Sequence, residues 1–223
     1  MLTLAAIGII GWMLYPHADL QPLPHPLISH SSEEGVSLLK SSEFFVDYAP
    51  LSKNFQAQIL VSYCGIASSV TVLKALGKDL NQKNFFTDEV SKVRSQIKVI
   101  FAGIPLTDLG AILEAQGLKS SIHHANESSV ELFRYAIERN LANVDDYLIV
   151  NYQRKLLGQE SAGHISPLAA YNRKNDNVLI MDTTSNMYPP TWVPVKMLFD
   201  AMMTIDPETG EMRGYIEISR YEI

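Results

Sequence analysis

The sequence has one cysteine, Cys64, among 223 residues. One thiol excludes a disulfide framework within the chain and any zinc site built on several cysteine thiolates. It is compatible with either a reducing or an oxidising compartment. Basic residues are also few: 18 Lys and Arg stand against 24 Asp and Glu, and they form no cluster. We therefore expect no nucleic-acid partner, because such binding leaves a basic footprint in the sequence.

Charge is missing from the N-terminus, where the first acidic residue is Asp19 and the first basic one is Lys40. The apolar run from Leu2 to Tyr15 is short for a membrane span of roughly 20 residues. It has the length of a signal-peptide core, roughly 7–15 residues, although the usual basic start is absent. We expect a signal or membrane anchor on an exported, periplasmic protein. The alternative is that the run forms a buried N-terminal helix of a cytoplasmic protein.

A proline-rich stretch follows and predicts an extended tether. It places a domain boundary after residue 32, with residues 1–32 as anchor and tether and residues 33–223 as the folded domain. Hydrophobic residues at 47% and charged residues at 19% fit a globular fold.

Helical patterns cover the first half of this domain and strand patterns the second. Helices are expected near residues 64–76, 106–116 and 128–142, the last opened by a capping box of Ser128 and Glu131. Strands are expected at 146–153, 163–172, 177–184 and 214–221. This segregation predicts an α+β fold with an antiparallel sheet.

Cys64 precedes Gly65 at the start of the first predicted helix. A lone cysteine is usually a small buried hydrophobic residue. A helix N-terminus, however, favours the thiolate and lowers the thiol pKa. A nucleophilic cysteine also needs a base and a group that orients the base.

His164 and Asp182 are the candidates for those two roles. They begin and end two adjacent predicted strands, and they lie symmetrically about residue 173, close to the centre of the polar loop at 172–177. A hairpin would bring them to neighbouring positions, with a bulge absorbing the small offset. The order cysteine, histidine, carboxylate then follows the logic of a catalytic triad. The alternative for Asp182 is a turn or strand-end residue.

Four blocks give the sequence a family resemblance: "YCGIAS", "GHISPLAAY", "YPPTWVP" and "IDPETGEMRGYIEISR". In this order they resemble phytochelatin synthase, a papain-like cysteine transpeptidase family, over roughly residues 43–220. The resemblance implies a papain-like fold, with the nucleophile helix packed on a C-terminal antiparallel sheet.

The resemblance also implies site residues. Cys64 matches the nucleophile, His164 the general base and acid, Asp182 the orienting acid, and Gln58 the glutamine that donates to an oxyanion hole. The substrate-binding positions that it implies are Arg154, Gly163, Asp206 and Arg213. Asp206 would pair with the α-amino group of a γ-glutamyl substrate and Arg213 with its α-carboxylate. Without the resemblance, Gln58 could be a surface residue and Asp206–Arg213 a salt bridge across a turn.

The activity implied is cleavage of the Cys–Gly bond of glutathione through a thioester, with transfer of γ-Glu-Cys to water or to a second glutathione. The segment Thr183–Met187 lacks the basic residues that family members tend to carry there, so we expect hydrolysis to dominate. Alternatives are a papain-like hydrolase of another γ-glutamyl or thiol peptide and a binding protein for thiol-bound metal. No tightly bound cofactor is expected, and cadmium or zinc would act as glutathione thiolates. A homodimer rests on the resemblance alone.

Overall fold

The computed structural model describes residues 14–160 and 162–221. The predicted signal or anchor at residues 2–15 lies almost entirely outside them. Within the described part of the chain, no helix is both long and apolar enough to cross a bilayer.

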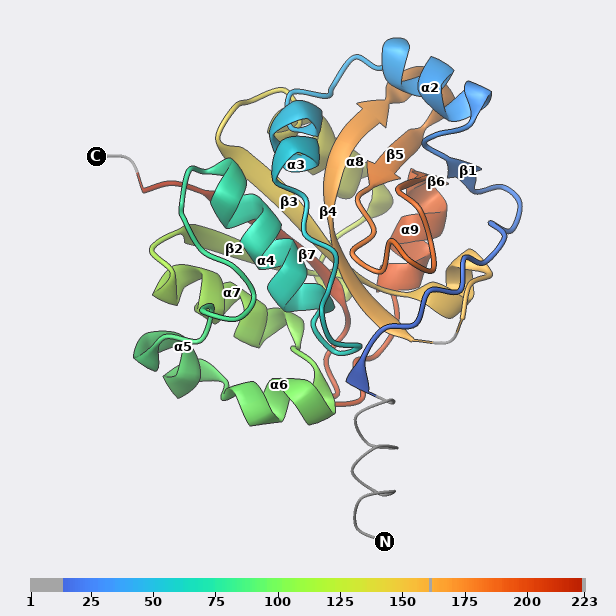
Figure 1. Cartoon of the computed structure of the whole chain (residues 1–223). Helices are drawn as coiled ribbons and strands as arrows, with labels where there is room; N and C mark the ends of the chain where they lie inside the picture. Colours follow the sequence, from blue (N-terminus) through green and yellow to red (C-terminus); the bar gives the residue numbers. More distant parts are fainter. Residues whose placement is uncertain (1–13, 161, 222–223) are drawn as a thin grey trace, which may run out of the picture.

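Seven antiparallel strands form one sheet in the order β1-β6-β5-β4-β3-β7-β2 (Figure 1). In chain order their bounds are β1 Ile28–Ser29, β2 Lys119–His124, β3 Asp146–Gln153, β4 Gly163–Asn172, β5 Asn177–Ile180, β6 Thr191–Pro194 and β7 Gly214–Ser219. Helices are α2 Glu33–Lys40, α3 Tyr48–Asn54, α4 Cys64–Ala75, α5 Asp88–Val93, α6 Gln96–Ala102, α7 Leu106–Ala115, α8 Val130–Asn140 and α9 Val195–Met202. The predicted α+β class with an antiparallel sheet is confirmed.

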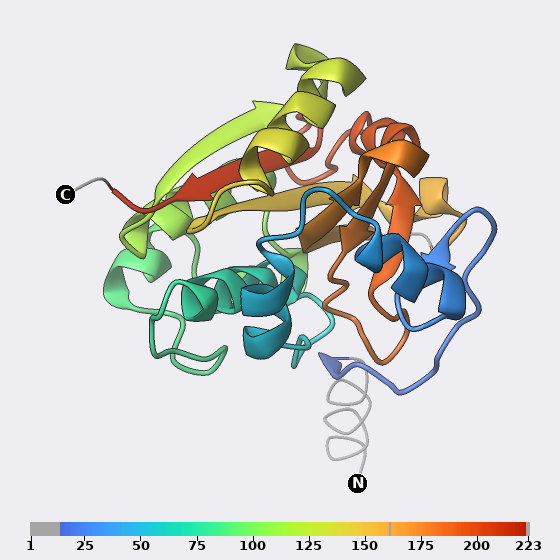
Figure 2. The ribbon, with the colours of Figure 1, turned by 90° about the horizontal axis from the view of Figure 1, so that it is seen from above.

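The sheet separates two hydrophobic cores. Helices α3, α4, α5 and α7 contribute to one core, and α8 and α9 contribute to the other. Figure 2 shows these two groups on opposite faces of the sheet. The long strands β3 and β4 carry buried side chains on both faces, which explains their nearly continuous apolar sequences.

Helix α4 carries Cys64 at its first position and is buried along most of its length, from Gly65 to Leu73. It ends at Ala75 with Leu76 as its C-cap, and Gly77 follows with φ 84°, a left-handed conformation that glycine adopts without strain. The helix predicted near residues 64–76 is confirmed. Such a helix packs tightly: a Cβ on Gly65 would lie 3.3 Å from side-chain carbons of Ile104 and Ile165.

Two local predictions are wrong. The proline-rich stretch was expected outside the domain, yet Ile28 and Ser29 pair with β6 and Leu27 is buried in the second core. A boundary after residue 32 therefore cuts through the sheet. The cap of α8 is Ser129, not Ser128: the Ser129 side chain accepts a hydrogen bond from the backbone N–H of Leu132.

Candidate active site

The predicted hairpin of β4 and β5 is present and determines the site. Asn172 pairs with Asn177 next to the turn, and the register shifts at a bulge between Leu168 and Ala170. This shift moves the pairing toward the register in which His164 lies opposite Asp182, as expected from the sequence. His164 at the start of β4 thereby lies beside Asp182, just beyond β5, with 3.0 Å between His164 Nε2 and Asp182 Oδ1.

Cys64 and His164 line one cavity of about 420 Å³. Helix α4, which carries Cys64, packs on β4, which carries His164, and Ser68 joins them. The Ser68 hydroxyl donates a hydrogen bond of 3.0 Å to the carbonyl of Ile165, the residue after His164. The fold thus brings together the three residues of the predicted triad.

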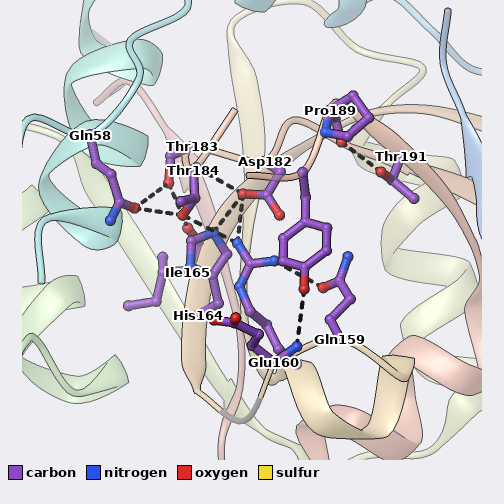
Figure 3. Close-up of polar contacts among 12 residues, drawn as sticks. Gln58, Gln159, Glu160, His164, Ile165, Asp182, Thr183, Thr184, Pro189 and Thr191 are labelled. Carbon is purple, nitrogen blue, oxygen red and sulfur yellow. Dashed lines mark hydrogen bonds and ion pairs between the residues drawn. The ribbon is translucent and has the colours of Figure 1, made fainter. Parts of the chain in front are cut away.

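Asp182 is buried and accepts three hydrogen bonds at Oδ1. Besides His164, the donors are Arg154 Nη2 at 2.7 Å and the backbone N–H of Thr184 at 2.8 Å (Figure 3). Burial opposes ionisation of this carboxyl group, but His164 and Arg154 outweigh burial and hold its pKa well below the usual range. Asp182 therefore stays an anion and orients the imidazole.

The two reacting groups are neutral in the free site. Burial and the charge of Arg154 lower the pKa of His164, against the opposing effect of Asp182. Burial also raises the pKa of the Cys64 thiol. This rise is opposed, but less strongly, by backbone groups at Ile165 and Gly65 and by the charge of Arg154. The helix N-terminus was expected to lower this pKa, but desolvation wins in this buried position. A neutral imidazole beside a thiol is suited to act as a general base.

Arg154 was predicted to bind substrate, and in the structure it lies against the triad acid. Its side chain is buried and engages Asp182, Thr184 and Gln159, and its guanidinium lies 4.8 Å above the ring of Tyr188. It is not among the residues that line the Cys64 cavity. Because all these contacts lie on the Asp182 side, Arg154 orients the acid of the triad, and its contact with substrate stays a prediction.

Gln58 is buried next to the triad. Its Oε1 accepts hydrogen bonds from Thr184 at 3.0 Å and Thr183 at 3.3 Å (Figure 3). Its Nε2 donates to the Val61 carbonyl at 2.8 Å. It lines a second cavity of about 350 Å³, which shares Val61 with the Cys64 cavity. The amide nitrogen keeps a second hydrogen, so the oxyanion role stays a prediction that this orientation permits.

Gly163, Asp206 and Arg213 line the same cavity as Cys64. Arg213 is buried, its Nη2 lies 3.8 Å from Asp206 Oδ2, and its Nη1 donates to Thr204 Oγ1 and the Ile205 carbonyl. Its Nε is buried and has no hydrogen-bond partner among the residues that the structure describes. A Cβ on Gly163 would lie 2.8 Å from Arg213 Nη2, so only glycine leaves room for this guanidinium.

Other parts of the cavity were not predicted. Asn151 is buried on the central strand β3 and lines it, as do Phe101 of α6 and Glu208. The sequence offered one signal for Asn151: it is a polar residue within the largely apolar run "DYLIVNYQ". Among the described residues, no group of three His, Cys, Asp or Glu side chains could hold a metal ion.

Comparison with known proteins agrees with this arrangement. The family model for phytochelatin synthase matches residues 18–215. Glutathione gamma-glutamylcysteinyltransferase 3 of Lotus japonicus is 34% identical over 87% of this chain and 43% of its own length. The corresponding enzyme 2 of Arabidopsis thaliana is 30% identical over 89% and 46%, and the Schizosaccharomyces pombe enzyme is 23% identical over 76% and 42%.

The chain thus spans less than half the length of these curated relatives. The family match nevertheless covers almost all of the described domain and includes every predicted site residue from Gln58 to Arg213. The chain belongs to the phytochelatin synthase family.

Proposed function

We propose that the chain is a cysteine-dependent γ-glutamylcysteinyltransferase that cleaves the Cys–Gly bond of glutathione. One observation carries this proposal. A Cys64 nucleophile, a neutral His164 held by Asp182, and a pair of the buried Arg213 with the partly buried Asp206 all border one cavity. The names of the relatives support glutathione as the substrate.

The Asp206–Arg213 pair suits the γ-glutamyl end of glutathione, which carries a free α-amino group and a free α-carboxylate. Arg213 is held from one side by Thr204 and Ile205, and its contact with Asp206 is long at 3.8 Å. A substrate carboxylate would supply the charge-assisted partner that this buried cation lacks. The Asp206 carboxylate would accept hydrogen bonds from the α-ammonium group.

The first half-reaction follows from the triad. His164 takes the Cys64 proton, and the thiolate attacks the carbonyl carbon of the Cys–Gly bond. The tetrahedral intermediate collapses when the carbon–nitrogen bond breaks and His164 returns the proton to the glycine nitrogen. A γ-glutamylcysteinyl thioester remains on Cys64.

Gln58 supports the developing oxyanion in this proposal. Its amide is fixed by Val61, Thr183 and Thr184, so little reorganisation is needed during the reaction. A preorganised donor of this kind is worth roughly 2.7–4 kcal/mol of transition-state stabilisation.

The second half-reaction transfers the acyl group to water or to the amino group of a second glutathione. Water gives γ-Glu-Cys, and glutathione gives a phytochelatin of two units. In the segment Thr183–Met187, two threonines are used to hold Gln58, and Asn186 bonds to the carbonyl of His17. Because no lysine or arginine is present in this segment, we infer that hydrolysis outpaces transfer to an anionic acceptor.

Four further features belong to the proposal. The fold is papain-like, since a nucleophile helix packs on an antiparallel sheet that carries the histidine. The substrate brings any cadmium or zinc as a glutathione thiolate. The apolar N-terminus exports the domain or tethers it to a membrane, in a bacterium on the periplasmic side. The domain forms a homodimer.

Glutathione turnover tests the function directly. The purified full chain is incubated with glutathione, with and without Cd²⁺, and glycine, γ-Glu-Cys and phytochelatin are followed by mass spectrometry. We expect glycine release that is lost in Cys64→Ser, with γ-Glu-Cys as the main early product. Absence of glycine release would overturn the assigned activity, and mostly phytochelatin at early times would overturn the preference for water.

A further inference from the structure

The rim of the Cys64 cavity carries exposed apolar side chains. Phe101 lines the cavity and is 77% exposed, and Ile97, one turn earlier on α6, is 69% exposed. Val61 also lines the cavity and is mostly exposed, as is Tyr15, which shares the neighbouring cavity with Val61. We call these four residues, Tyr15, Val61, Ile97 and Phe101, the rim patch.

The apolar N-terminal run leaves the described domain at this patch. The backbone N–H of Val61 donates a hydrogen bond of 2.9 Å to the carbonyl of Leu14, the first described residue. The thirteen residues before it, "MLTLAAIGIIGWM", contain no charged side chain. In Figure 1 the first described residues and α6 lie at the same lower edge of the molecule.

The exposed rim patch and the uncharged sequence before Leu14 have one common explanation. Exposed apolar clusters at a surface mark interaction sites, and an apolar segment of this length partitions into a lipid interface. The net charge of −6 disfavours attraction to anionic lipids, whereas apolar insertion needs no charge. The rim patch lies beside Leu14, where the described chain begins, and both the patch and the uncharged sequence before Leu14 favour an apolar phase.

We propose that the rim patch docks on a lipid bilayer beside the N-terminal run, so that the Cys64 cavity opens at the membrane surface. This goes beyond a simple tether, which would leave the domain free to rotate at the end of a flexible segment. The bilayer covers Phe101 and Ile97 of α6, and the γ-glutamyl site at Asp206 and Arg213 stays on the cavity wall. The inference does not depend on the catalytic activity of Cys64.

A fluorescent label at residue 101 tests the docking. Because Cys64 is the only thiol, Cys64→Ser combined with Phe101→Cys allows labelling of the full chain with an environment-sensitive dye at one position. The matched control combines Cys64→Ser with Leu132→Cys, since Leu132 is 57% exposed but lies on α8, on the opposite face of the sheet. Both proteins are mixed with phosphatidylcholine vesicles that contain phosphatidylcholine spin-labelled near its head group.

We expect the dye at position 101 to shift to shorter wavelength and to be quenched by the spin label, without dependence on salt, while the dye at position 132 does neither. Three results would overturn the proposal. The first is that the chain does not bind the vesicles. The second is that it binds, but the dye at position 101 is unquenched or no more quenched than the dye at position 132. The third is that the shift at position 101 grows with protein concentration in the absence of vesicles. The last result would identify a second copy of the chain as the occupant of the patch.

Discussion

At the scale of single residues, Arg154 acts on the reacting imidazole through a shared partner. Asp182 Oδ1 accepts hydrogen bonds from both Arg154 and His164. The positive charge of Arg154 therefore neutralises part of the negative charge of the carboxylate, which would otherwise stabilise an imidazolium. The charge also acts directly, and together with burial it lowers the pKa of His164. The residue thus keeps the base unprotonated in the free enzyme.

Arg154→Met should therefore move the acidic limb of the pH profile of kcat/KM to higher pH. Without the cation the pKa of His164 rises, and a smaller fraction of the base is neutral at a given pH. Breaking a buried ion pair should also cost about 3–5 kcal/mol of unfolding free energy. Arg154→Lys is the control, because it keeps the charge and should leave the limb close to its original position. A limb that stays or moves to lower pH in Arg154→Met would contradict this role.

Gly163→Ala should raise the KM for glutathione much more than it lowers kcat. The new methyl group would meet Arg213 Nη2 at 2.8 Å and displace the guanidinium that we propose binds the substrate carboxylate. A charge-assisted hydrogen bond is worth about 1.5–3 kcal/mol, so kcat/KM should fall about tenfold or more. Arg213→Ala alone and the double variant complete a mutant cycle. Strictly additive losses would show that Gly163 does not act through Arg213.

At the scale of elements, Ser68 determines how the nucleophile helix meets the strand of the base. Ser68→Ala removes the hydrogen bond from α4 to the Ile165 carbonyl and should cost about 1 kcal/mol of unfolding free energy. It should also lower kcat, because a small shift of α4 changes the geometry between Cys64 and His164. Ser69→Ala is the matched control, since its hydroxyl bonds to Gly65 within the same helix. Equal effects on kcat in the two variants would exclude a specific role for Ser68.

The sequence was informative for elements with a strong apolar period. Helix α4 and the hairpin of β4 and β5 were predicted, and with them the meeting of His164 and Asp182. Strand β2 was not predicted, because the sequence "KSSIHH" has few apolar residues and this edge strand is paired only with β7. The burial of Arg154 behind Asp182 could not be predicted either. It depends on how the turn after β3 folds back over the end of β5, which leaves no periodic signal.

At the scale of the whole molecule, two buried carboxyl groups make stability depend on pH in opposite directions. Asp182 has a depressed pKa, so its contribution to stability is lost as pH falls below the usual range of aspartate. Asp47 is also buried, but burial and the nearby charges of Asp146 and Asp145 raise its pKa to about 9. Within the described part of the chain, its Oδ2 has no hydrogen-bond partner. The folded state therefore holds a proton on Asp47 that the unfolded state releases at neutral pH.

Asp47→Asn should stabilise the protein increasingly as pH rises. Between the unfolded pKa of about 3.9 and the folded pKa of about 9, the folded state binds more protons at Asp47, so the native protein loses stability through this window. Asparagine is neutral throughout and removes that loss. We expect similar melting temperatures of the variant and the native chain near pH 4 and a growing advantage of the variant toward pH 9.

Thermal unfolding of the full chain across this range is the measurement, with Asp200→Asn as the control. Asp200 is exposed and pairs with Lys196 on α9, so its replacement should change the melting temperature little, and by a nearly constant amount above pH 5. A difference for Asp47→Asn that does not grow with pH would mean that Asp47 is ionised inside the fold. A stabilising partner for its carboxylate would then have to exist and to outweigh both burial and the charges of Asp146 and Asp145.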